Sequence, residues 1–297
     1  MTQDRLTISF MRQSQIVIRL LVVSALILFF IPGPIDAASV WKVTGPNGGL
    51  LYLGGSIHAL RSSDYPLPSA YNRVFDASSR LAFEVDEKAL TQSSKGISKA
   101  GEFPHGDSLK KHVDPRTYDY LKRLFGLMGV SEDKFAKYRP WYLALMLESL
   151  AMQGRSDELG VEQFLARRAR ANSKPVTGLE SAHEHMEVFS GLTDRQSEAY
   201  LLLEFIPSGQ GSVNSSMSAW RRGDADSIAR DFHAAYRDFP SLAVRLLDHR
   251  NHNWVPKIEN YLRSGQTYFV VVGAAHLGGS EGLIALLRAR GCKIEQL

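Results

Sequence analysis

Two short segments, far apart in the chain, carry glycine and histidine at the same spacing. Gly55-Ser56-Ile57-His58 follows an apolar run at residues 50–53, and Gly273-Ala274-Ala275-His276 follows the run at residues 268–272. Both runs are typical of strands, so each histidine is expected just beyond a strand end, where ligands of open sheets bind. Glycine there permits a close approach of a ligand. The alternative, two structural histidines that cap the following helices, fits the same spacing.

A carboxylate lies in a third strand-like segment. Glu84 follows Leu81-Ala82-Phe83, and with His58 and His276 it would offer two nitrogens and one oxygen with open coordination positions. Such a set suits a catalytic divalent metal ion, which activates water and polarises a carbonyl group. Alternation along a strand places Glu84 and Asp86 on one face, so exposure of both carboxylates to solvent is the competing interpretation.

Two more residues are candidates for supporting chemistry. Glu180 follows a weaker strand at residues 175–177 and could be a ligand or the general base, or a charge at the N-terminus of a helix. Arg250 could donate to a developing oxyanion, although an isolated arginine is more often a salt-bridge partner. The cluster His183-Glu184-His185 lacks the HExxH spacing and is interpreted as part of an ordinary helix surface.

Composition excludes several classes of protein. The chain has 297 residues, 44% of them hydrophobic and 22% charged, which is ordinary for a globular protein. The net charge of +4 is too small to indicate a nucleic-acid partner. Cys292 is the one cysteine, so an intrachain disulfide and a thiolate zinc site are excluded. Nucleotide-binding glycine motifs and the GxSxG elbow of serine hydrolases are absent as well.

The first 37 residues have the pattern of an export signal. Arg5, Arg12 and Arg19 precede an apolar run at residues 20–31, which Pro32 ends before the small residue Ala37. A twelve-residue helix rises about 18 Å, less than the ~30 Å of a bilayer core. The pattern predicts a signal peptide over residues 1–37 and a mature protein, periplasmic or secreted, over 38–297. An uncleaved leader that anchors the protein in the inner membrane is the alternative, and we expect no other membrane contact.

The remaining elements predict how these residues come together. Strands are expected near residues 40–43, 50–53, 81–85, 175–177, 268–272 and 293–294. Helical spacing of apolar residues covers most of the chain between 117 and 263, and again 282–290. Residues 92–106 are predicted to be a mobile loop. The fold class is therefore α+β with α/β character: a central mixed sheet from the N- and C-terminal parts, with a large helical block inserted between them.

The motifs, taken in order, resemble those of a known family. YLGGSIHAL, LAFEVD, Gly160-Val161-Glu162, KPVTGLES, Arg250-Asn251 and VVGAAHLGG follow one another as in the TraB/GumN family, from Trp41 to the C-terminus. That family includes the TIKI metalloproteases and is distantly similar to erythromycin esterases and ChaN-type haem-binding proteins. The resemblance implies one TraB/GumN-like domain over residues 38–297. Glu162 is a mild departure, because aspartate is expected there as often.

The resemblance also implies roles for the candidate residues. His58, His276 and Glu84 would form the metal or catalytic centre, with Glu180 and Arg250 as supporting site residues. The TIKI branch cleaves peptide bonds with a divalent cation such as manganese or cobalt. The combined prediction is an exported hydrolase of peptide or other acyl bonds that uses Mn²⁺, Co²⁺ or Zn²⁺ on a peptide or small-molecule substrate. The alternative is a non-catalytic accessory protein that binds haem, metal or peptide.

Overall fold

A computed structural model describes residues 38–155, 158–203, 205 and 210–297. A six-stranded sheet forms its centre, in the order β6-β4-β7-β2-β1-β8. The four strands from β6 to β2 run parallel, whereas β1 is antiparallel to both β2 and β8. The strands are β1 (Val40–Thr44), β2 (Leu50–Ser56), β4 (Arg80–Val85), β6 (Val176–Glu180), β7 (Tyr268–Gly273) and β8 (Lys293–Gln296).

The sheet confirms the predicted fold class, because its strands come mainly from the two ends of the described chain. The central strand β7 is almost entirely buried, as expected for a parallel strand covered on both faces. The β1–β2 hairpin turns at Gly48, whose φ of +79° favours glycine. The predicted leader, residues 1–37, lies outside the described residues.

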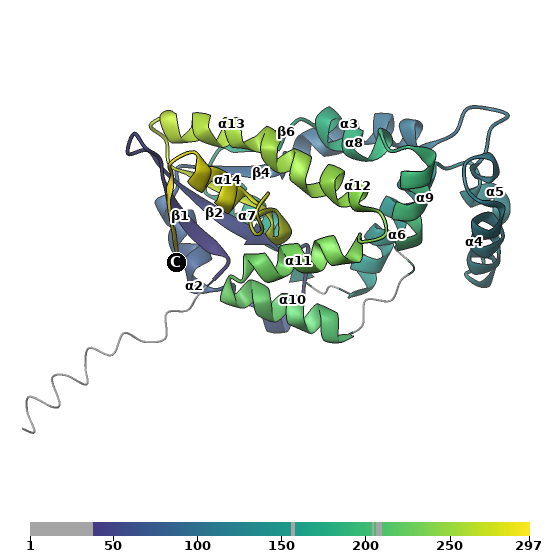
Figure 1. Cartoon of the computed structure of the whole chain (residues 1–297), viewed down its shortest axis with the longest axis horizontal. Helices are drawn as coiled ribbons and strands as arrows, with labels where there is room; N and C mark the ends of the chain where they lie inside the picture. The colour runs from purple at the N-terminus through teal and green to yellow at the C-terminus, as the bar shows by residue number, and fades with distance from the viewer. Residues whose placement is uncertain (1–37, 156–157, 204, 206–209) are drawn as a thin grey trace, which may run out of the picture. The chain divides into compact units, whose positions relative to one another are not determined.

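Helices cover both faces of the sheet and form a separate layer beside it (Figure 1). On one face Phe269 and Val271 pack against Tyr71 of α2, Leu165 of α7 and Trp220 of α10. The other face meets α13 and α14. The long helices are α2 (Ser69–Ala77), α3 (Glu87–Gly101), α4 (Pro115–Leu127), α6 (Pro140–Arg155), α7 (Val161–Ala171), α8 (Ala182–Ser190), α9 (Asp194–Leu203), α10 (Gln210–Arg222), α11 (Ala225–Ala235), α13 (His249–Arg263) and α14 (Leu283–Ala289).

Short elements connect the long ones. A third hydrophobic cluster joins α4, α6 and α9, and Figure 1 places α4 and α5 (Glu132–Phe135) at the end remote from the sheet. α12 (Pro240–Ala243) continues through a π-helical turn, η3 (Val244–Asp248), directly into α13. β3 (Ala59–Leu60) pairs with β5 (Glu158–Leu159). Among the described residues, the helices are too short or too polar to cross a membrane.

The predicted mobile loop at residues 92–106 is wrong over most of its length. Helix α3 runs through this segment as far as Gly101. Its N-cap residue is Asp86, whose side chain accepts a hydrogen bond from the Lys88 amide. That cap satisfies one free donor of the first helical turn. The serines and lysine of this segment lie on an amphipathic helix, and α3 packs on α8.

Candidate functional site

The parallel strands bring the predicted residues to one edge of the sheet. Because β6, β4, β7 and β2 are parallel neighbours, their carboxyl ends lie at the same edge. Glu180 and Glu84 occur at the ends of β6 and β4, while His276 and His58 follow β7 and β2. The sheet topology therefore explains how glycine-histidine segments more than 200 residues apart reach one region.

Arg250 is the buried centre of this region. Its Nη2 donates to Glu84 Oε2 at 2.6 Å and to Glu180 Oε2 at 3.0 Å, and its Nε donates to Glu180 Oε1 at 2.9 Å. The three side chains are each about one tenth exposed or less. The guanidinium group thus neutralises two carboxylates that water does not reach, which is the setting in which ion pairs matter most. Helix α13 begins at His249, so Arg250 is in its first turn rather than after a helix.

Glu84 is directed into the site rather than to solvent. Its Oε1 accepts a 2.7 Å hydrogen bond from the Gly273 amide, and only 8% of the residue is exposed. Asp86 instead caps α3, which resolves the earlier alternative in which both carboxylates were solvated. Although burial alone would raise the pKa of Glu84, the charge of Arg250 holds it far below its usual range.

His276 lies against the same carboxylate. Its Nε2 is 3.7 Å from Glu84 Oε1 and 3.3 Å from Arg250 Nη1, while its Nδ1 is 2.7 Å from Asn251 Oδ1. Trp254 packs on the ring at 4.5 Å between centroids. Burial lowers the pKa of His276 to about 3 against the opposing charge of Glu84, so the ring is neutral at pH 7.

His58 is paired with a carboxylate that the sequence analysis left out of the site. Its Nδ1 is 3.7 Å from Oε2 of Glu162, and Oε1 of Glu162 accepts a hydrogen bond from Ser56 at 3.2 Å. Just over half of the His58 side chain is exposed, and Glu162 belongs to the first turn of α7. Desolvation of the His58 ring lowers its pKa, but the charges of Glu162 and Glu84 outweigh this and raise it.

Glu162 and Glu84 repel each other across the site. Burial, and next the charge of Glu84, raise the pKa of Glu162 to about 7. The fold thus gathers carboxylates around two imidazoles, with the single guanidinium of Arg250 between Glu84 and Glu180. Carboxylate and imidazole donors with excess negative charge suit a divalent cation. Among the residues that the structure describes, no three His, Cys, Asp or Glu side chains already stand close enough to hold an ion.

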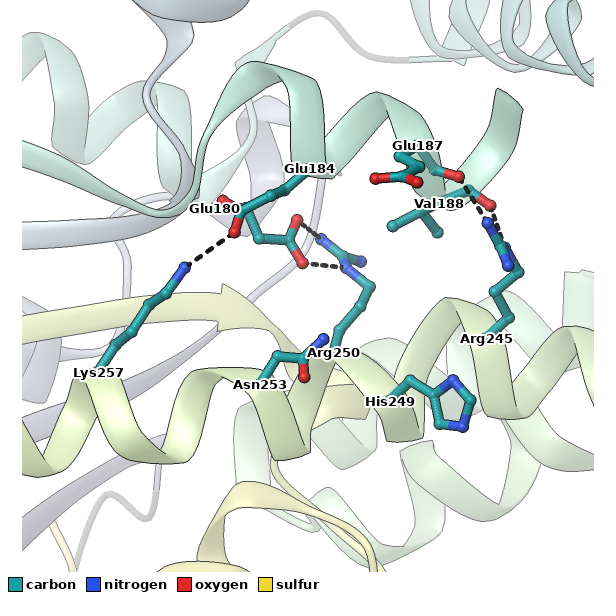
Figure 2. Close-up of a pocket in the computed structure, with 9 residues that line it drawn as sticks. All are labelled: Glu180, Glu184, Glu187, Val188, Arg245, His249, Arg250, Asn253 and Lys257. Carbon is teal, nitrogen blue, oxygen red and sulfur yellow. Dashed lines mark hydrogen bonds and ion pairs between the residues drawn. The ribbon is translucent and has the colours of Figure 1, made fainter. Parts of the chain in front are cut away.

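A pocket of about 460 Å³ opens beside the Glu180–Arg250 pair, and both side chains line it. Figure 2 shows it between α8 and α13, with Arg250 reaching across to Glu180. Lys257 and Glu184 form an ion pair at 3.6 Å at one end, and at the other end Arg245 donates to the Val188 and Glu187 carbonyl groups. A ligand in this pocket would contact Glu180 and Arg250 directly.

Three residues of the site were missed or set aside in the sequence. His185, interpreted as an ordinary helix residue, has its Nδ1 3.1 Å from Glu180 Oε2 and 3.3 Å from Arg250 Nη2, so that interpretation is corrected. Trp254 donates its indole N–H to Glu180 at 3.0 Å. Glu162 ends the Gly160-Val161-Glu162 motif, whereas His185 and Trp254 each follow a motif by a few positions, which is the one local signal that pointed to them.

The Glu162 environment gives a testable pH dependence of stability. Because the pKa of Glu162 rises from 4.5 to about 7 in the fold, the folded protein keeps a proton that the unfolded chain releases between these values. The free energy of unfolding therefore falls as the pH rises through this window. We expect Glu162→Gln to raise the free energy of unfolding of the metal-free protein by about 1–3 kcal/mol at pH 8, with most of the gain gone by pH 5.

Urea denaturation at pH 5 and pH 8 measures this effect. Glu187→Gln, at an exposed carboxylate of α8, is the matched control and should change stability by less than about 0.5 kcal/mol at either pH. A Glu162→Gln protein that is less stable than the wild type at pH 8 would contradict the repulsion between Glu162 and Glu84.

Comparisons with known proteins identify the family of the chain. The model of the TraB/PrgY/gumN family matches residues 39–296. The uncharacterized protein YbaP of Escherichia coli (strain K12) is 26% identical over 250 residues, which cover 83% of this chain and 90% of YbaP. The metalloprotease TIKI2 of Danio rerio is 23% identical over 303 residues, covering 82% of this chain and 58% of TIKI2. No solved structure matches. The chain belongs to the TraB/PrgY/gumN family.

Proposed function

We propose that this protein is a metal-dependent hydrolase of peptide or other acyl bonds. The observation that supports this most is the excess of carboxylate around two imidazoles at one sheet edge, where burial and next the charge of Glu84 raise the pKa of Glu162 to about 7. A distant relative, TIKI2, is named a metalloprotease, and the proposed reaction is of the same kind. Its identity of 23% does not carry the proposal alone.

The proposed ion ligands are His58, Glu84 and His276, as predicted from the sequence. A divalent ion, Mn²⁺, Co²⁺ or Zn²⁺, would supply an activated water and polarise the carbonyl group of the substrate. Small movements of His58, which is half exposed, would bring the donors together. Glu84 and His276 are already held by their neighbours at a separation of 3.7 Å.

In this proposal the general base is Glu162 rather than Glu180. A pKa of about 7 lets Glu162 accept and return a proton near neutral pH. Although burial raises the pKa of Glu180, hydrogen bonds with His185 and Arg250 lower it to about 2. Trp254 donates to the same carboxylate. We therefore assign Glu180 to the anchoring of Arg250. The earlier prediction of Glu180 as the base stays untested.

Arg250 would act on charge that develops near Glu84 and His276. Its Nη1 lies 3.3 Å from both the Leu246 carbonyl and His276 Nε2. Because Glu84 and Glu180 hold the planar guanidinium group in place, this nitrogen would be a fixed donor for an oxyanion that develops beside His276. The pocket between α8 and α13 would hold part of the substrate, since Glu180 and Arg250 line it. Export to the periplasm or the medium remains part of the proposal, through the leader predicted over residues 1–37.

A metal titration of the full chain tests the proposal. We expect Mn²⁺, Co²⁺ or Zn²⁺ to stabilise the metal-stripped protein by about 3 kcal/mol at a hundredfold excess over Kd, and to support cleavage of a peptide mixture. His58→Ala and His276→Ala should lose the stabilisation and the cleavage. His105→Ala, at an exposed histidine outside the site, should keep both.

Binding experiments also distinguish the metal-dependent hydrolase from the rival function, a non-catalytic accessory protein. Binding of haem, seen as a Soret band, or binding of peptide without cleavage would favour the non-catalytic accessory protein. A wild type that binds none of the three ions, or that binds them unchanged after both histidine substitutions, would remove the metal proposal.

A further inference from the structure

The side chain of Asn251 has only one chemically consistent orientation. It is fully buried, and its Nδ2 lies 2.9 Å from the backbone carbonyl of Glu281, which can only accept a hydrogen bond. The amide nitrogen must therefore face Glu281, and the amide oxygen must face His276. The carbonyl group is itself held in place, because the carboxylate of Glu281 is bonded to His252, the next residue of α13, at 2.7 Å.

The contacts of His276 then fix where its proton is. Asn251 Oδ1, 2.7 Å from Nδ1, can only accept, so Nδ1 carries the hydrogen. On the other side of the ring, Arg250 Nη1 can only donate, and it faces Nε2 at 3.3 Å. Two independent partners thus require the same tautomer. The same Nε2, which accepts from Arg250, also lies 3.7 Å from Glu84 Oε1.

We infer that Asn251 is a positioning residue that holds His276 in the Nδ1-protonated tautomer, with the lone pair of Nε2 presented to the site beside Glu84. Adjacent residues of α13 perform two tasks: Arg250 neutralises the carboxylates, and Asn251 orients the imidazole. A neutral imidazole whose other nitrogen donates to a fixed acceptor is the form that binds a metal ion best. That consequence rests on the proposed function, whereas the tautomer does not.

The tautomer can be measured without metal or activity. Long-range ¹H–¹⁵N spectra of the full chain, metal-free and labelled at histidine, distinguish protonated from bare ring nitrogens, and His276→Gln identifies the signals of His276. We expect Nδ1 protonated and Nε2 bare in the wild type. Asn251→Leu should lose this single pattern, because leucine offers Nδ1 no acceptor. Asn260→Leu, at an exposed asparagine of α13, is the control and should leave the pattern unchanged.

Affinity for Mn²⁺, Co²⁺ and Zn²⁺ provides the second readout. Asn251→Leu should weaken binding about 10- to 100-fold, as the loss of such a partner typically does. A protonated Nε2 in the wild type, or an unchanged pattern in Asn251→Leu, overturns the inference. A wild type that has the expected tautomer but binds no ion contradicts the proposed function and leaves the role of Asn251 standing.

Discussion

Replacement of Arg250 by methionine is expected to lower the free energy of unfolding by about 3–5 kcal/mol, the typical result of removing one partner from a buried ion pair. Methionine keeps much of the volume and the apolar stem, so the loss reports mainly on charge. Without the guanidinium group, Glu84 and Glu180 remain buried with no counter-charge. Both carboxylates must then bind protons or admit water.

The pH dependence should identify the cause. In the wild type, burial raises the pKa of Glu180, but hydrogen bonds with His185 and Arg250 hold it near 2, below its usual 4.5. These contacts therefore stabilise the fold above about pH 4.5, and the stabilisation is lost as the pH falls toward 2. The difference between wild type and Arg250→Met should therefore shrink as the pH is lowered from 6 to 3. A difference that stays constant over this range would indicate lost packing instead.

Two further variants control the experiment. Arg263→Met, at an exposed arginine in the last turn of the same helix, should cost less than about 1 kcal/mol. Glu180→Gln added to Arg250→Met should restore part of the lost stability, because it removes one stranded charge while keeping an acceptor for Trp254. If Arg250→Met unfolds in urea as Arg263→Met does, the buried ion pairs do not stabilise the fold.

Local sequence pattern was sufficient for the strands and for the glycine-histidine segments at their ends. Apolar runs predicted β2 and β7. Because parallel strands have their carboxyl ends at one edge of a sheet, His58 and His276 were then expected in one region. The same reasoning failed at residues 92–106, where serine and glycine suggested a loop. Asp86 starts a helix there, and packing of α3 on α8 outweighs the weak helix propensity of these residues.

The contacts within the site could not be predicted, because they depend on tertiary structure. The motif that includes Glu162 was visible, yet only the packing of α7 against the segment after β2 shows that its carboxylate meets His58. Arg250 looked like an isolated surface arginine because its partners are 70 and 166 residues away. His185 resembled a helix-surface residue since its spacing from Glu180 carries no recognised motif.

Gly160 allows α7 to pack against the segment that carries His58. Its replacement by alanine is the second substitution from which we expect a large effect, on both stability and ion binding. An added Cβ would lie 2.2 Å from the carbonyl oxygen of His58 and 2.6 Å from its carbonyl carbon. Both are backbone atoms, so no side chain can rotate away. The φ of −64° at Gly160 is one that alanine also adopts, so backbone conformation does not require glycine here. The close approach to His58 does.

Gly160→Ala should consequently displace His58 while leaving every proposed ligand in the sequence. The Val161 amide donates to the Ile57 carbonyl at 3.1 Å, and β3 pairs with β5 beside it, so the shift would disturb both contacts. We expect a loss of about 1–3 kcal/mol in the free energy of unfolding, as overpacking typically costs. Affinity for divalent ions should fall as it does in His58→Ala, since Glu162 and His58 would no longer face each other.

Gly96→Ala is the matched comparison, because a Cβ at this position of α3 meets nothing within 4 Å. That substitution should stabilise the protein by about 0.4–1 kcal/mol through the lower entropy of the unfolded chain, and leave ion binding unchanged. Urea denaturation and metal titration of the two variants together separate a general effect of alanine from a local one at His58. A Gly160→Ala protein with wild-type stability and wild-type ion affinity would show that His58 does not depend on the approach of α7, and the pairing of His58 with Glu162 would lose its structural basis.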